Sequence, residues 1–93
     1  MPEPYFDLLE EGDSLYLEVA LPGVLETDID VTLAGSTIVI RAHRLAFRGL
    51  SLYCEIKRGV LLREISLPCP VELLKSRYED GVLWLQFRRL EAG

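Results

Sequence analysis

The 93-residue sequence is poor in the residues that carry catalysis and metal binding. It contains a single histidine, His43, and two cysteines, Cys54 and Cys69. A structural zinc site needs four ligands, so we expect no metal site, and the cysteines are expected to be reduced and to pack as small apolar groups. With one histidine there is no Ser-His-acid triad, and no glycine-rich phosphate loop is found. We therefore expect a protein without enzyme activity and without a cofactor.

Long apolar runs and a secretory signal are also missing. No stretch approaches the roughly 18 to 20 apolar residues that cross a bilayer, and the start of the chain, residues 1–4, has neither a basic nor an apolar segment. These absences predict a cytoplasmic protein that does not bind membranes.

Basic residues are absent from the first third of the chain. Residues 1–30 contain nine acidic residues and no Lys or Arg, and the net charge of the whole chain is −5, which leaves +4 for residues 31–93 (−5 minus −9). The overall negative charge disfavours nucleic-acid binding. The asymmetry is expected to be a solvated acidic face, and the alternative is that it orients two subunits or attracts the two ends within one fold.

The hydrophobic residues, 49% of the chain, follow the two-residue period of β-strands. Glycine- and proline-containing turns separate predicted strands at 5–10, 14–21, 29–33, 37–42, 52–56, 60–67 and 82–87. Between them we expect a polar connector at 26–28, a looser loop at 43–51 with His43 exposed, and at most one helical turn at 72–76. Trp84 is expected in the core. This pattern predicts one domain over residues 1–93, an all-β, antiparallel, immunoglobulin-like β-sandwich of seven to eight strands.

Three motifs lie at the ends of these predicted strands. Leu21-Pro22-Gly23-Val24 is followed by the segments 28–31 and 38–42, a second motif runs from Gly59 to Pro68, and the third occupies residues 78–85. In this order and spacing the sequence resembles the small heat-shock proteins, the family of the α-crystallin domain. It departs from them at Leu61, where an aromatic residue is usual, in a shorter stretch from Val71 to Lys75, and at Arg88-Arg89. About four residues flank the predicted strands at each end, so we expect almost no amino-terminal arm or carboxyl-terminal tail.

The resemblance implies a groove between two sheet-edge strands that accepts an I-x-I/V motif or a segment of an unfolding protein. Carried over to this chain, the groove strands are 29–33 and 60–67, with the apolar side chains Ile29, Val31, Leu33, Leu61 and Ile65. The alternative is that these five residues belong to the core.

The resemblance also implies a homodimer, formed through the loop 43–51 or the strand 52–56. Its expected interface comprises Phe47, Tyr53, Glu55 and Arg63. Among apolar strand residues, Arg63 needs an acidic partner such as Glu55 or an acid of another subunit. The alternative is an ordinary surface arginine.

The leading functional hypothesis is an ATP-independent holdase chaperone, whose partners are unfolded or partly unfolded proteins bound through extended apolar segments. One alternative is a specific protein-interaction module similar to the p23-like co-chaperones, which would have one defined partner. Another is a dimerising core domain without chaperone activity of its own.

Overall fold

The computed structural model describes residues 3–45, 52 and 58–90, and every regular element in this part of the chain is a β-strand. The seven strands are β1 (Phe6–Glu11), β2 (Ser14–Ala20), β3 (Val24–Ala34), β4 (Thr37–Arg44), β5 (Gly59–Ser66), β6 (Val71–Glu79) and β7 (Val82–Arg89). None of the described segments forms a helix that could cross a membrane.

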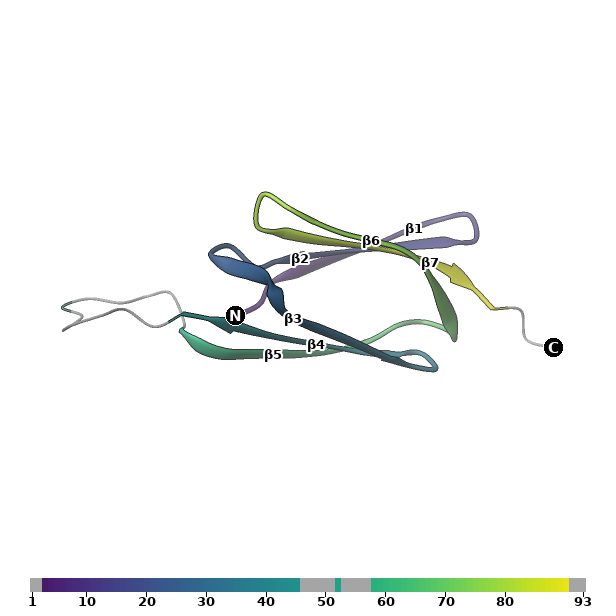
Figure 1. Ribbon diagram of the computed structural model, residues 1–93. Helices are drawn as coiled ribbons and strands as arrows, with labels where there is room; N and C mark the ends of the chain where they lie inside the picture. The colour runs from purple at the N-terminus through teal and green to yellow at the C-terminus, as the bar shows by residue number, and fades with distance from the viewer. Residues whose placement is uncertain (1–2, 46–51, 53–57, 91–93) are drawn as a thin grey trace.

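The strands form two antiparallel sheets that pack face to face (Figure 1). One sheet has the order β1-β2-β7-β6, and the other has the order β3-β4-β5. We call them the four-stranded and the three-stranded sheet. The predicted antiparallel sandwich is therefore confirmed, with seven strands.

The core lies between the two sheets and follows the alternation read from the sequence. In β2, Leu15, Leu17 and Val19 are buried and the residues between them are not. β3 to β7 also contribute inward-facing apolar side chains, and Leu21 and Leu67 join them from the connections that follow β2 and β5. Together with the residues of β2 they form one continuous cluster: Leu21, Val24, Ile38, Ile40, Ala42, Leu61, Ile65, Leu67, Val71, Leu83, Leu85 and Phe87. Burial of this apolar surface is the main source of stability.

Three predictions about local structure are wrong. The predicted connector at 26–28 lies within β3, and the predicted helical turn at 72–76 lies within β6, where pairing with β7 supplies the backbone hydrogen bonds. Trp84 is not in the core, because it alternates with the buried Leu83 and Leu85 and points to the outer face, with 37% of its surface exposed. His43 is exposed as predicted, although it lies in β4. The predicted strand 52–56 lies outside the described residues, apart from Leu52 at a bend.

Arg44, the last residue of β4, is the one buried charged residue among the described residues, at 0% exposure. Its Nε donates a hydrogen bond to the carbonyl oxygen of Pro22 at 2.9 Å, and its terminal nitrogens lie 3.2 and 3.4 Å from the two carboxylate oxygens of Glu3. Burying a charge is costly unless it is paired in this way. Arg44 therefore holds the amino-terminal segment and the β2–β3 loop against the end of β4.

The β2–β3 loop also contacts the β6–β7 turn, which brings two of the sequence motifs together. The amide of Leu21 donates to the carbonyl oxygen of Gly81 at 2.7 Å. Gly81 has a φ of 76°, and a Cβ built on it would lie 3.1 Å from the Cα of Pro22. Glycine is therefore required at position 81 for two reasons: its backbone has a positive φ, and the β2–β3 loop lies too close to leave room for a Cβ atom.

We expect Gly81→Ala to destabilise the protein more than Gly12→Ala. Gly12 also has a positive φ, of 60°, but a Cβ there meets nothing within 4 Å. Gly12→Ala, the control, should therefore lower the free energy of unfolding only by the cost of a positive φ at alanine, about 1 kcal/mol. Gly81→Ala should lower it further, by on the order of 1 kcal/mol or more, because the new methyl group displaces Pro22. Chemical denaturation measures both losses. Equal losses would contradict the close approach.

We also expect Arg44 and Glu3 to be energetically coupled. Arg44→Ala should lower the free energy of unfolding by about 3 to 5 kcal/mol, because it leaves the carboxylate in a partly buried site without its counter-charge. In a double-mutant cycle with Glu3→Gln, the coupling free energy should be about 1 to 3 kcal/mol. Strictly additive losses in denaturant melts would show that the two side chains do not interact.

Candidate functional site

A groove runs between two strands that stand at the free edges of different sheets. β3 is an edge of the three-stranded sheet, β6 is an edge of the four-stranded sheet, and the described residues place no strand on the outer side of either. The groove has a volume of about 260 Å³. It is lined by Glu26, Ile29, Val31, Leu73, Ser76, Arg77, Tyr78, Leu83 and Leu85.

The walls of the groove are apolar side chains that the core covers only in part. Ile29 and Val31 of β3 are half-buried and pack against the core cluster. Opposite them, Leu73 of β6 is 42% exposed. The register of β6 shifts between Leu73 and Lys75, so the intervening Leu74 forms a bulge. Because of this extra residue, Leu73 points toward the groove and Lys75 points to the opposite face of the sheet.

Tyr78 closes one end of the groove. Its hydroxyl lies 2.7 Å from the carbonyl oxygen of Leu21 and 2.6 Å from that of Val24, and it donates its single hydrogen to these two acceptors. Burial raises the pKa of the Tyr78 hydroxyl above its ordinary value of 10.0, the charge of Arg44 acts in the opposite direction, and Glu26 raises this pKa further. The phenol therefore stays protonated and fixes the loop that forms this end.

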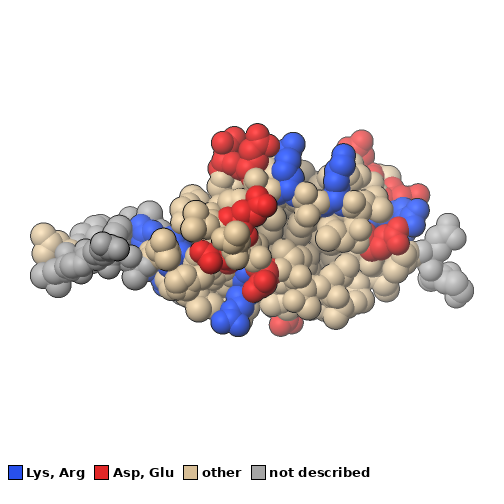
Figure 2. Space-filling view, in the orientation of Figure 1, with Lys and Arg blue, Asp and Glu red and all other residues tan. Residues whose placement is uncertain are grey.

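The charges around the groove are unevenly distributed. Glu26, Asp28 and Asp30 lie on β3, and Arg77 lies on β6. Figure 2 shows acidic side chains over the β3 segment, and side chains of both signs standing on the side of the four-stranded sheet. Within residues 3–45, 52 and 58–90, no group of three or more His, Cys, Asp or Glu side chains could hold a metal ion. The groove thus offers apolar walls and two backbone edges.

The comparison with known proteins identifies the family. The profile of the Hsp20/alpha crystallin family matches residues 7–93. The chain belongs to this family. Small heat shock protein C2 of Rickettsia felis is 28% identical over 97% of this chain and 62% of its own length, and a probable 15 kDa heat shock protein of Leptospira interrogans is 30% identical over 86% and 65%. The chain therefore spans a little under two thirds of the curated relatives that it matches.

Solved structures of the Hsp20/alpha crystallin family share the fold. Heat shock protein 16.0 from Schizosaccharomyces pombe superposes with a TM-score of 0.80 at 21% identity, covering 97% of this chain and 89% of that one. A Del-C4 mutant of hsp14.1 from Sulfolobus solfatataricus gives a TM-score of 0.76 at 25% identity, covering 92% and 74%. The two-sheet arrangement described above is therefore the fold of these solved structures of the family.

Within this family member, the structure separates the five predicted groove residues. Ile29 and Val31 line the groove, and Leu33 is half-buried on the same side of β3. The prediction was wrong for Leu61 and Ile65, which are core residues at 0% and 3% exposure. The physical reason is the strand order, because β4 lies between β3 and β5 and keeps β5 away from the groove. The second wall is β6, which sequence reasoning missed because residues 72–76 were assigned to a helical turn.

The predicted dimer residues lie elsewhere. Phe47, Tyr53 and Glu55 are outside the described residues. Arg63 is half-buried on β5, and the carbon of its guanidinium lies 4.8 Å from the centroid of the Phe6 ring on β1. This distance is within the range of a cation–π interaction. It links β1 and β5, the two edge strands on the side of the sandwich away from the groove.

Tyr78 provides a pH-dependent test of the closed end of the groove. Its pKa is raised in the folded state, so between pH 10 and the folded pKa the folded protein holds a proton that the unfolded chain has lost. Stability from this residue is therefore present below pH 10 and is lost as the pH rises above it. Tyr78→Phe should lower the free energy of unfolding by about 1 to 3 kcal/mol at pH 7, and the deficit should shrink above pH 10. Urea melts across this range measure it, and a deficit that does not change with pH would contradict the assignment.

Proposed function

We propose that this protein is an ATP-independent holdase that binds extended apolar segments of unfolding proteins in the groove between β3 and β6. The observation that carries the proposal is that two free strand edges flank one strip of half-buried apolar side chains. A free edge presents unpaired backbone N–H and C=O groups, and an extended segment can pair with them as an additional strand. Membership of the Hsp20/alpha crystallin family supports this function.

The chemistry of the groove favours weak and reversible binding. If a bound segment covers about 400 Å² of apolar surface, the gross gain is on the order of 10 kcal/mol. Most of this gain is offset by the loss of freedom on association and by the ordering of the segment. Ile29, Val31 and Leu73 supply apolar contacts without shape selectivity for one side chain. Such a site suits many clients with alternating apolar residues, and the proposal requires no nucleotide.

We include a homodimer in the proposal. Arg63, with Phe47, Tyr53 and Glu55, remains the predicted interface. The contact of Arg63 with Phe6 on the side away from the groove is compatible with a dimer that leaves the groove free.

Two neighbouring leucines allow a matched test of the groove. Leu73 lines it, and Leu74, with a similar exposure of 48% against 42%, does not. Leu73→Lys should weaken binding of a labelled peptide with an I-x-I motif at least tenfold, because it removes an apolar contact worth about 1.5 to 3 kcal/mol and adds a charge. Leu74→Lys should change the affinity less than twofold. Fluorescence anisotropy measures both, and circular dichroism checks the fold of each variant.

The same two variants test the holdase activity. With the protein in molar excess and no ATP, light scattering from a heat-labile client should fall, and Leu73→Lys should lose most of this protection while Leu74→Lys keeps it. Unchanged scattering with the wild-type protein would favour a core domain without chaperone activity. Capture of one stoichiometric partner in place of a broad, heat-dependent set would favour the specific interaction module.

A further inference from the structure

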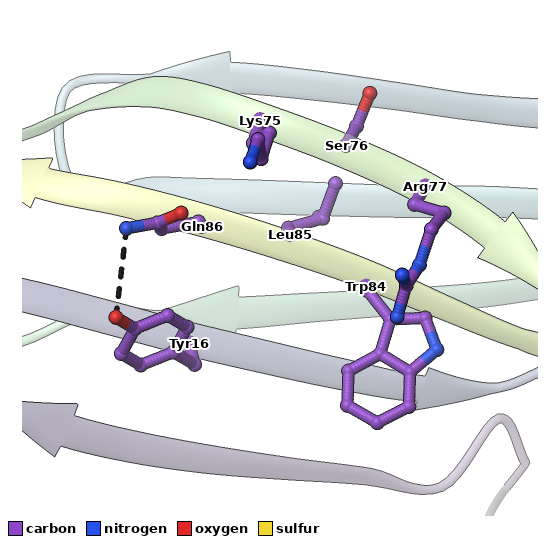
Figure 3. Close-up of a pocket in the computed structure, with 7 residues that line it drawn as sticks. All are labelled: Tyr16, Lys75, Ser76, Arg77, Trp84, Leu85 and Gln86. Carbon is purple, nitrogen blue, oxygen red and sulfur yellow. Dashed lines mark hydrogen bonds between the residues drawn. The ribbon is translucent and has the colours of Figure 1, made fainter.

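The outer face of the four-stranded sheet carries a second surface, which meets the rim of the groove at Arg77. A hollow of about 390 Å³ on this face is lined by residues of β2, β7 and β6, including Tyr16, Trp84, Gln86, Lys75 and Arg77 (Figure 3). The amide nitrogen of Gln86 donates to the Tyr16 hydroxyl at 3.5 Å, and the Arg77 guanidinium lies 5.5 Å from the Trp84 ring centroid. We call this surface the outer aromatic face.

The register of the strands arranges these residues in two rows that cross the sheet. One row runs from β1 to β6 through Leu9, Tyr16, Gln86 and Lys75. The next row runs through Asp7, Glu18, Trp84 and Arg77. The first row has an aromatic and an amide side chain in the middle, the second has Glu18 and Trp84, and each row ends in a basic side chain on β6.

The charge on the outer aromatic face is divided between its two halves. Asp7, Glu11 and Glu18 are the charged residues that β1 and β2 point outward, and all three are acidic. On the β6 side, Lys75 makes no ion pair with another described residue, and Arg77 is 64% exposed and pairs only with the equally exposed Glu79, at 3.4 Å. Glu72 and Glu79 of β6 also point outward, and Glu72 pairs with Arg88 of β7. The β1–β2 half is therefore negative, whereas in the half next to the groove the basic residues Lys75, Arg77 and Arg88 outnumber the acidic ones by one.

This division makes the face complementary to itself. A two-fold axis parallel to the strands, between β2 and β7, places β1 of one copy over β6 of another. Asp7 of each copy then faces Arg77 of the other, and Tyr16 faces Gln86. Glu11 faces Glu72, whose charge is balanced by its ion pair with Arg88. A two-fold contact needs such a self-complementary patch. The same rotation stacks the two sheets in the aligned packing that β-sandwiches use.

We propose that the outer aromatic face is a contact surface for a second copy of this chain. Four strands spaced by about 4.8 Å, and rows about 6.8 Å apart, give a patch well below the roughly 800 Å² that each partner of a stable complex buries. The contact is therefore transient, weakened by salt, and additional to the dimer in the proposed function. It leaves β3 and the groove uncovered.

Trp84 is the only tryptophan of the chain and lies in the middle of the contact, so its fluorescence reports on this surface alone. Acrylamide quenching of Trp84 should decrease about twofold or more as the protein is concentrated from about 10 µM to about 1 mM, and about 0.5 M salt should reverse the decrease. Association through Arg63 and the loop 43–51 would change the sedimentation without protecting Trp84.

Charge exchange tests the predicted pairing. Asp7→Arg and Arg77→Asp should each abolish the concentration-dependent protection of Trp84, because each puts like charges opposite one another. A one-to-one mixture of the two variants, and the double variant D7R/R77D, should restore it, because an acidic position again faces a basic one. Arg41→Asp and Glu64→Arg make the same charge changes on the outer face of the three-stranded sheet and should have no effect.

Four results would overturn the proposal. They are quenching that does not depend on concentration, single variants that associate like the wild type, a mixture that stays dissociated, and protection of Trp84 only when an unfolding client is added. The last result would assign the face to clients.

If either reversal impairs folding, as judged by circular dichroism, the milder Asp7→Asn and Arg77→Gln should each weaken the association several-fold, and an unchanged association would count against the contact. If the protein does not associate through this face, the wild-type protein can still bind the I-x-I peptide in the groove. The self-association proposal and the holdase proposal can therefore fail independently.

Discussion

The buried guanidinium of Arg44 is the interaction on which the geometry of the groove depends. It joins the amino-terminal segment, through Glu3, to the β2–β3 loop, through the carbonyl of Pro22. Tyr78 holds the same loop from the other side, at Leu21 and Val24. Since a buried charge without its partners is costly, the loop has one favourable position. That position sets where β3 leaves the loop and therefore how far apart the two walls of the groove stand.

β6 contributes to two surfaces at once. Its inward side chains, such as Leu73 and Tyr78, belong to the groove, and its outward side chains, Lys75 and Arg77, belong to the outer aromatic face. Arg77 touches both, because it lies at the rim of the groove and over the ring of Trp84. The two surfaces are different in chemistry. The groove offers apolar contacts and backbone hydrogen bonds, whereas the outer face offers aromatic rings between opposite charges.

Alternation predicted most of the fold from the sequence, since Leu15, Leu17 and Val19 face the core as expected. It failed where local patterns mislead. The segment 72–76 has no alternation because the bulge at Leu74 interrupts it, so β6 and its part in the groove were missed. Trp84 was expected in the core, yet its position on β7, between the buried Leu83 and Leu85, turns it outward. The burial of Arg44 could not be predicted from the sequence, because it results only from the packing of segments that are distant along the chain. Leu61 and Ile65 were assigned to the groove because the alternation pattern does not predict the order of strands in a sheet, which places β4 between β3 and β5.

The bulge in β6 has a consequence for how related chains can diverge in length. Leu74 is the extra residue of the bulge, so a chain without it would alternate regularly, with Leu73 still facing the groove and Lys75 still facing outward. Removing one residue elsewhere in the strand would instead turn the side chains on one side of the deletion to the opposite face. Related chains can therefore be one residue shorter at the bulge and retain both surfaces, whereas elsewhere in this strand their lengths must differ by an even number.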